Sequence, residues 1–118
     1  MQRKAIEENL IVNLTFNFAV LITNYCEQLE GQRKYNISNQ LFRSGTSIGA
    51  NVWEAQNAES KADFIHKFKI AAKEMEETNF WLLLCKNINS LPNPEIVLEE
   101  LKNIQRVITK IISTAKRN

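Results

Sequence analysis

Glycine, proline, cysteine and histidine are all scarce in this chain of 118 residues, which has three glycines, two prolines, two cysteines and one histidine. β-Sandwiches and barrels need many turn residues and helical bundles need few, so this scarcity favours an all-α fold. Cys26 and Cys85 stand far apart and form no CxxC or Cys/His spacing, which excludes a disulfide framework and a zinc motif. We expect two reduced, buried thiols in a cytoplasmic protein.

A strong charge of one sign is lacking too. The 15 basic and 13 acidic residues leave a net charge of +2, well below that of a dedicated nucleic-acid binder. Hydrophobic residues make up 44% and charged residues 24%, which is ordinary for a globular protein and excludes a disordered chain. The length suits one domain with its own core, so we predict a single domain over residues 1–118.

Residues 9–26 carry no charge and require a test for a membrane-spanning helix. Asn13, Asn17 and Thr23 interrupt the stretch, and its longest unbroken apolar run covers only residues 18–22. A spanning helix needs about 20 predominantly apolar residues, so we expect no membrane segment. The polar, partly acidic start of the chain is also wrong for a signal peptide, which again favours a cytoplasmic location.

Helical periodicity divides the chain into four segments. Gly31 is a plausible residue to follow the first helix, while Ser38, Ser60 and Asn93 are candidate N-caps. Short connections between the segments imply antiparallel neighbours, so the sequence predicts an up-down-up-down antiparallel four-helix bundle. The predicted helices cover roughly residues 6–29, 38–58, 61–87 and 93–117.

Each predicted helix carries a core stripe of apolar residues. The stripes are Leu10, Leu14, Phe18, Leu21, Tyr25 and Leu29 in the first helix; Ile37, Leu41, Gly45, Ile48, Val52 and Ala55 in the second; Phe64, Phe68, Ala71, Met75, Leu82 and Cys85, with Thr78 among them, in the third; and Leu98, Leu101, Ile104, Ile108, Ile111 and Ala115 in the fourth. The first and third helices have further apolar residues outside their stripes, which one bundle core cannot cover. We therefore predict an oligomer interface made of Val12, Phe16, Val20, Trp53, Trp81, Leu83 and Leu84.

Gly45 and Gly49 lie four residues apart inside the second predicted helix. Each costs about 1 kcal/mol relative to alanine in a helix interior, so close approach of a neighbouring helix is the expected compensation. A nucleotide-binding loop is the alternative, but no Lys-Ser/Thr pair follows and no strand precedes.

No group of residues indicates an active site, a metal or a cofactor. His66 is the only histidine, and with Asp63 it could supply two metal ligands, which are too few for a stable site. Glu74, Glu76 and Glu77 indicate a solvated face, with an ion pair from Lys73 to Glu77. We expect that the protein is not an enzyme.

Four basic residues follow one side of the last predicted helix: Lys102, Arg106, Lys110 and Arg117. A single strip of this kind is most often a solvated face, but repeated around an oligomer it would attract phosphate groups. Arg43, in the second helix, is a further candidate cation. RNA or a nucleic-acid-processing protein is then the expected partner, and the alternative is a structural or adaptor bundle that binds another protein.

Two segments resemble a known bacterial family. Residues 43–55 read RSGTSIGANVWEA and residues 60–68 read SKADFIHKF. They are similar to the motifs of the four-helix-bundle family of the 23S rRNA intervening-sequence protein, which is related to the accessory protein of diversity-generating retroelements. The residues that match are Ser47, Ile48, Gly49, Ala50, Asn51, Glu54, Ser60, Phe64 and Phe68.

The resemblance implies a four-helix bundle that assembles as a homopentameric ring, with nucleic-acid binding suggested for the retroelement relatives. It also implies a structural role for the matching motif residues, with Asn51 and Glu54 bonding across helices or to the turn before the third helix. The alternative for Asn51 and Glu54 is that they bind a ligand or a partner. The family's usual Ala-Glu-Gly ending of the second helix is replaced here by Trp53, Glu54 and Ala55, which puts a shared binding surface near that end in doubt.

Overall fold

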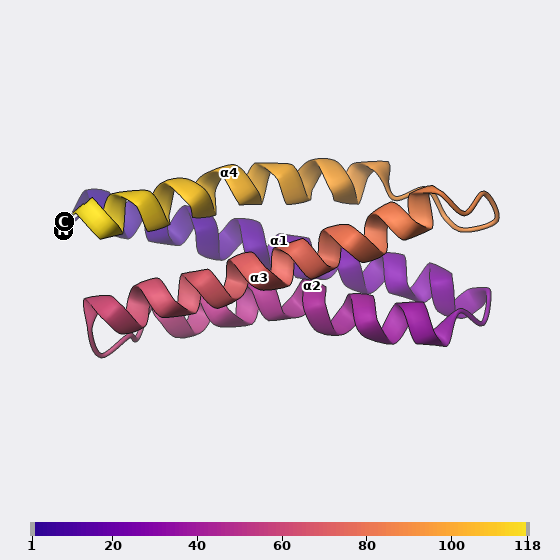
Figure 1. Ribbon diagram of the computed structural model, residues 1–118, viewed down its shortest axis with the longest axis horizontal. Coiled ribbons are helices and arrows are strands. Elements are labelled where there is room, and N and C mark those ends of the chain that lie inside the picture. The colour runs from indigo at the N-terminus through magenta and orange to yellow at the C-terminus, as the bar shows by residue number, and fades with distance from the viewer. Residues whose placement is uncertain (1, 118) are drawn as a thin grey trace.

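The fold is an all-α, up-down-up-down antiparallel four-helix bundle, as the sequence predicts (Figure 1). The computed structural model describes the backbone of residues 2–117 and the side chains of residues 10–117. The helices are α1 (Gln2–Gly31), α2 (Tyr35–Ala55), α3 (Lys61–Lys86) and α4 (Glu95–Arg117). The start of α1 and the end of α4 lie at the same end of the bundle.

The helices are arranged as a square in cross-section. Each packs against its neighbours in sequence, and α4 closes the square against α1, so α2 and α4 are diagonally opposite. The core runs the length of the molecule, from Ile11 of α1 and Ile111 of α4 at one end to Leu29 of α1 and Leu91 at the other. Its largest fully buried side chains include Phe18, Phe68, Leu41, Leu82 and Ile104.

The buried stripe of α1 differs in part from the predicted one. Ile11, Thr15 and Ile22 are buried together with Phe18, Tyr25 and Leu29, whereas Leu10 is 50% exposed and Leu14 and Leu21 are only partly buried. Apolar residues lie around most of this helix, so the sequence alone did not determine which side of the helix faces the core. Thr15 can occupy a core position because its hydroxyl donates to the Ile11 carbonyl oxygen at 2.8 Å.

The turn between α1 and α2 also corrects two predictions. Arg33, and not Gly31, adopts the left-handed conformation (φ 61°), with hydrogen bonds from Lys34 N to Leu29 O and from Arg33 N to Glu30 O that form a Schellman motif. Because this turn is so tight, α2 begins at Tyr35 and Ser38 is not its N-cap.

Ser38 is instead buried inside α2. Its hydroxyl lies 3.4 Å from the Cys26 carbonyl oxygen and 3.1 Å from Glu30 Oε2. The residue predicted to begin the helix therefore links α2 to α1.

The starts of α3 and α4 are capped as predicted. Ser60 Oγ accepts a hydrogen bond from Asp63 N at 3.0 Å, and Asn93 Oδ1 accepts one from Glu95 N at the same distance. The connection between α3 and α4 is attached to α1, because the Tyr25 hydroxyl donates to the Pro92 carbonyl oxygen at 2.5 Å. The predicted stripes of α2, α3 and α4 are buried, except that Ile37, Phe64 and Ala115 are only partly covered.

The two glycines of α2 are explained by helix packing, as predicted. A Cβ atom at Gly45 would lie 2.8 Å from Ile22 Cγ1, and one at Gly49 would lie 3.1 Å from the Thr15 carbonyl oxygen. Glycine at these positions lets α1 and α2 approach more closely than any other residue would allow.

By length and composition, α1 alone among the described helices could cross a membrane, over Leu10–Gly31. In the bundle Phe18, Ile22 and Leu29 are fully covered, whereas Phe16 and Val20 are exposed, and a third of this apolar stretch is buried. The core helix of a soluble bundle passes the same test of length and composition, so this finding is weak evidence for a membrane span.

Candidate interaction surfaces

The α1/α2 side of the bundle has an apolar hollow of about 160 Å³. Phe16 and Trp53 line this hollow, and their side chains are 58% and 60% exposed. Exposed aromatic side chains that lie together can mark a site of contact with another molecule. The lining contains no charged residue and consists of Val12, Phe16, Ala19, Thr46, Gly49, Ala50 and Trp53. We call this surface the α1/α2 hollow.

Two further exposed side chains extend the α1/α2 hollow along the bundle. Val20 is one helical turn from Phe16 and is half exposed. Phe42 is exposed on α2 and shares a helix face with Gly49, seven residues later, and with Trp53, four residues after Gly49. The structure thus brings together four predicted interface residues, namely Val12, Phe16, Val20 and Trp53, and adds Phe42, which the sequence analysis missed.

The remaining predicted interface residues lie on α3. Leu83 and Leu84 are exposed beside Phe80, and these three residues define the α3 outer face. Ile88, in the connection that follows α3, is exposed as well. Phe80 is 60% exposed and was missed from the sequence, although its position two residues from both Thr78 and Leu82 places it opposite the buried stripe. Trp81 is half-buried, and its ring nitrogen donates to Glu77 Oε2 at 3.1 Å.

The four predicted basic residues of α4 are all exposed along the outer side of that helix, and we call them the α4 basic strip. Two of them, Arg106 and Lys110, flank a shallow apolar groove of about 230 Å³ with Leu10, Val107 and Ile111. Arg106 donates to Asn103 Oδ1 at 3.0 Å. Within residues 10–117 no acidic side chain forms an ion pair with any of the four.

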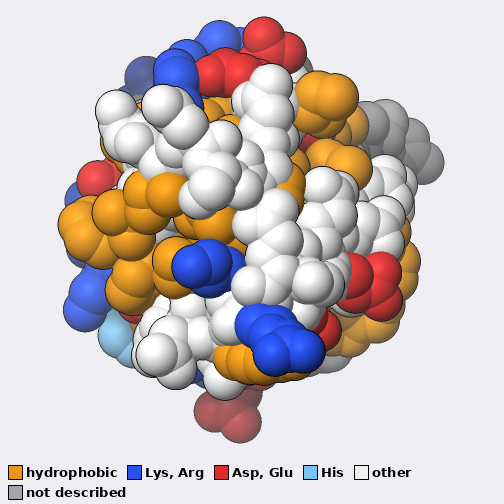
Figure 2. Space-filling model, turned by 90° about the vertical axis from the view of Figure 1, so that its right-hand side faces the viewer, with side chains coloured by type: hydrophobic (Ala, Val, Ile, Leu, Met, Phe, Trp, Pro, Cys, Tyr) orange, Lys and Arg blue, Asp and Glu red, His pale blue; other side chains and the backbone are white. Residues whose placement is uncertain are grey.

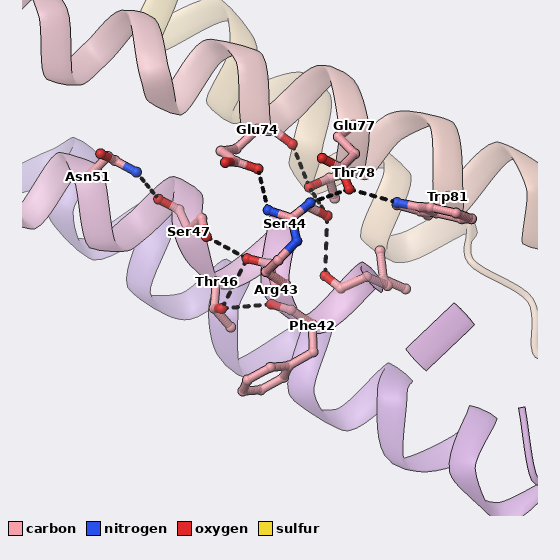
Figure 3. A network of polar contacts seen from close by, with 11 residues as sticks. Phe42, Arg43, Ser44, Thr46, Ser47, Asn51, Glu74, Glu77, Thr78 and Trp81 are labelled. Carbon is pink, nitrogen blue, oxygen red and sulfur yellow. Dashed lines mark hydrogen bonds and ion pairs between the residues drawn. The ribbon is translucent and has the colours of Figure 1, made fainter. Parts of the chain in front are cut away.

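Arg43 lies apart from this strip, on the diagonally opposite helix α2 (Figure 3). Its guanidinium contacts Glu74 Oε1 at 3.3 Å and Glu77 Oε2 at closer range. The predicted ion pair between Lys73 and Glu77 is therefore wrong, because Glu77 contacts Arg43 and Trp81. Glu74 was predicted to be solvated, and it forms an ion pair with Arg43. The Arg43 hydrogen bond lowers the pKa of Glu77, and the Glu77 carboxylate raises the pKa of Arg43.

The residues shared with the family motifs hold α1, α2 and α3 together. Gly49 admits the α1 backbone, Phe68 is buried beside Phe64 at a ring distance of 4.8 Å, and Glu54 forms an ion pair with Lys67 of α3 at 3.0 Å. Asn51 differs from the expectation, because its amide donates within its own helix to the Ser47 carbonyl oxygen at 2.8 Å.

Residues with potential chemistry are mostly occupied in structural contacts. Asp63 Oδ2 accepts a hydrogen bond from Glu59 N at 3.3 Å, and His66 is exposed. Cys26 and Cys85 are free and buried, as expected. Burial raises the pKa of Cys26 to about 11 and raises those of Cys85 and Tyr25, so both thiols are far from a reactive thiolate state.

The end of the bundle that carries the two connections at residues 32–34 and 87–94 has a mixed surface. Figure 2 shows mostly uncharged polar side chains and backbone there, with small hydrophobic groups and basic side chains between them and acidic side chains mainly at the margin. The sides of the bundle are therefore better candidates for interaction than this end.

These features define a class of protein: a small helical bundle with two exposed apolar faces and a basic strip. The chain belongs to the 23S rRNA-intervening sequence protein family, whose model matches residues 7–113. It is also similar to a protein of unknown function from the S23 ribosomal protein family of Bacteroides thetaiotaomicron VPI-5482. That crystal structure has 37% sequence identity and a TM-score of 0.85, over 91% of this chain and 98% of that one. None of the curated proteins matches the chain.

Proposed function

We propose that the protein is a non-enzymatic homo-oligomer, of the pentameric ring type that the family resemblance implies. The carrying observation is the α1/α2 hollow, where Phe16 and Trp53 are more than half exposed around an uncharged lining. Exposed apolar patches that are contiguous often mark sites of contact with another chain. A second copy of the chain is always available to cover it.

The assembled protein then binds RNA, or another nucleic acid, through the α4 basic strip. The support is that four cations lie along the outer side of α4 without an acidic partner among the described residues, beside a shallow groove. Each copy in a ring repeats the strip, and affinity for phosphate grows with every contact that releases counterions.

Self-association is tested by light scattering after size-exclusion chromatography. The chain should run at a multiple of its 13.6 kDa mass at micromolar concentration. Val20→Glu, which places a charge beside the hollow without entering the core, should shift the assembly to monomers. Gln105→Glu on exposed α4 is the matched control and should leave the mass unchanged. A monomeric native chain would refute the proposal.

Nucleic-acid binding is tested with a fluorescently labelled single-stranded RNA at 50 mM and 200 mM salt. The logarithm of the affinity should fall with the logarithm of the salt concentration, by about 0.7 for each phosphate contact. Replacing Lys102, Arg106, Lys110 and Arg117 by glutamine should remove most of that salt dependence while the mass of the assembly stays the same. Undetectable binding at 50 mM salt would exclude the RNA role and favour an adaptor that binds another protein.

A further inference from the structure

We propose that the two exposed apolar faces are the two halves of one head-to-tail interface. The α1/α2 hollow of one copy receives Phe80, with Leu83 and Leu84 beside it, from the α3 outer face of the next copy. The inference rests on the proposed self-association and specifies which surfaces meet.

A ring requires two different faces on each chain. In a two-fold dimer the same patch meets itself, whereas a closed ring of more than two copies needs two different patches on every chain. The chain offers two such patches, on separate parts of the bundle: the hollow lies over α1 and α2, and Phe80 points outward from α3. One copy can therefore use both at once.

The hollow and the Phe80 side chain also match in size. The small residues Ala19, Gly49 and Ala50 form the hollow, and its volume is about 160 Å³. A cavity of about 150 Å³ is known to hold a benzene ring, so the hollow is of the size that takes one aromatic side chain. Phe80 is 60% exposed and forms the most prominent part of the α3 outer face.

The two faces also match in charge. No charged side chain lines the hollow, so its partner must present an uncharged, apolar centre. The α3 outer face has Phe80, Leu83 and Leu84 at its centre, and the exposed Glu76 lies one helical turn from Phe80 at its edge. Another exposed apolar surface, at Leu10, has Arg106 and Lys110 in the groove itself, and their charges would be desolvated against the hollow.

Mixing two variants tests this pairing. Ala50→Glu blocks only the hollow and Phe80→Glu blocks only the α3 outer face, and both positions are exposed, so the bundle itself is preserved. Each variant alone should run as a 13.6 kDa monomer in light scattering. An equimolar mixture should form a dimer of twice that mass, because the intact α3 face of one variant fits the intact hollow of the other.

The possible results separate this inference from the proposed function. A monomeric native chain would refute self-association itself. If the native chain is an oligomer, two results would refute only the head-to-tail pairing. One is that the Phe80→Glu variant still assembles fully, and the other is that the mixture of the two variants stays monomeric. Circular dichroism verifies that each variant is folded. If either glutamate variant unfolds, Phe16→Lys and Leu84→Lys form a second pair that is mixed in the same way.

Discussion

The α1/α2 side of the bundle and the outer side of α4 differ in helix packing and in the charge of their surfaces. Between α1 and α2, two glycines bring the backbones so close that a Cβ atom at Gly45 would lie 2.8 Å from Ile22 Cγ1. The surface above them is uncharged and apolar. By contrast, α4 has a single buried stripe, and its exposed side carries the basic strip.

This difference indicates how the surfaces of the molecule are used. A helix with one apolar stripe, such as α4, has most of its apolar surface covered by one core, although Ile96 at its start is 72% exposed. On the α1/α2 side, Phe16, Val20, Phe42 and Trp53 lie outside the core, and the single chain leaves them exposed. The α1/α2 side is therefore suited to contact another chain, and α4 is suited to stay in water or to contact a polyanion.

Alkaline pH should have the largest effect on the stability of the fold, and it acts through buried side chains that α1 contributes to the core. Burial raises the pKa of Cys26 from 9.0 to about 11, and Tyr25 and Cys85 shift in the same direction. A raised folded-state pKa gives stability that is complete below pH 9 and is lost as the pH rises through 11, which for Cys26 amounts to about 3 kcal/mol. Urea unfolding between pH 8 and 11 measures the loss.

The Cys26→Ala variant should show a smaller loss over that range, and Lys110→Gln on α4 should show the same loss as the native chain. Stability that is constant from pH 8 to pH 11 would contradict the account of this buried cluster.

Adding a side chain between α1 and α2 should have the next largest effect. Gly45→Val and Gly49→Val should each destabilise the fold by about 2 kcal/mol, since the Ile22 side chain is buried and the Thr15 backbone cannot yield. Gly31→Ala is the control, because a Cβ atom there meets nothing within 4 Å. Thermal unfolding at fixed protein concentration compares the three, and equal effects would show that close helix approach is not the reason for the glycines.

Removing the cap of α4 should cost less. Asn93→Ala deletes the acceptor of the Glu95 N hydrogen bond and should destabilise the fold by about 1 kcal/mol. Because the change lies far from the α1/α2 hollow, the mass of the assembly should be unaffected. A change of oligomeric state in this variant would mean that the two regions are coupled.

Arginine replacements should have the smallest effect on stability and should separate the two regions by function. Arg43→Gln breaks contacts with Glu74 and Glu77 that are partly exposed, so the loss should be below about 1 kcal/mol and RNA affinity should not change. Arg106→Gln should leave stability unchanged and weaken RNA binding at 50 mM salt. If Arg43→Gln weakened RNA binding and Arg106→Gln did not, the polyanion site would lie on α2.

Much of the fold could be predicted from the sequence, because the signals were local. The Ser60 and Asn93 caps and the stripes of α2, α3 and α4 follow from spacing alone, and the glycine pair predicted the close approach of α1 and α2. The stripe of α1 was partly wrong, since a helix that is apolar nearly all round does not indicate which side faces the core.

The candidate surfaces were predicted less completely, for reasons of tertiary structure. The pairing of Arg43 with Glu74 and Glu77 depends on how α2 packs against α3, which no spacing in the sequence shows. The predicted interface residues fall on two separate faces for the same reason. Phe80 could have been found, because its spacing from Thr78 and Leu82 already places it opposite the core.

The most direct test of the account is the mass of the native chain in solution. Sedimentation equilibrium across a range of micromolar concentrations should give a fixed multiple of 13.6 kDa, five for the ring that the family resemblance implies. A chain that sediments at 13.6 kDa throughout that range would contradict the central claim that the α1/α2 hollow is covered by another copy.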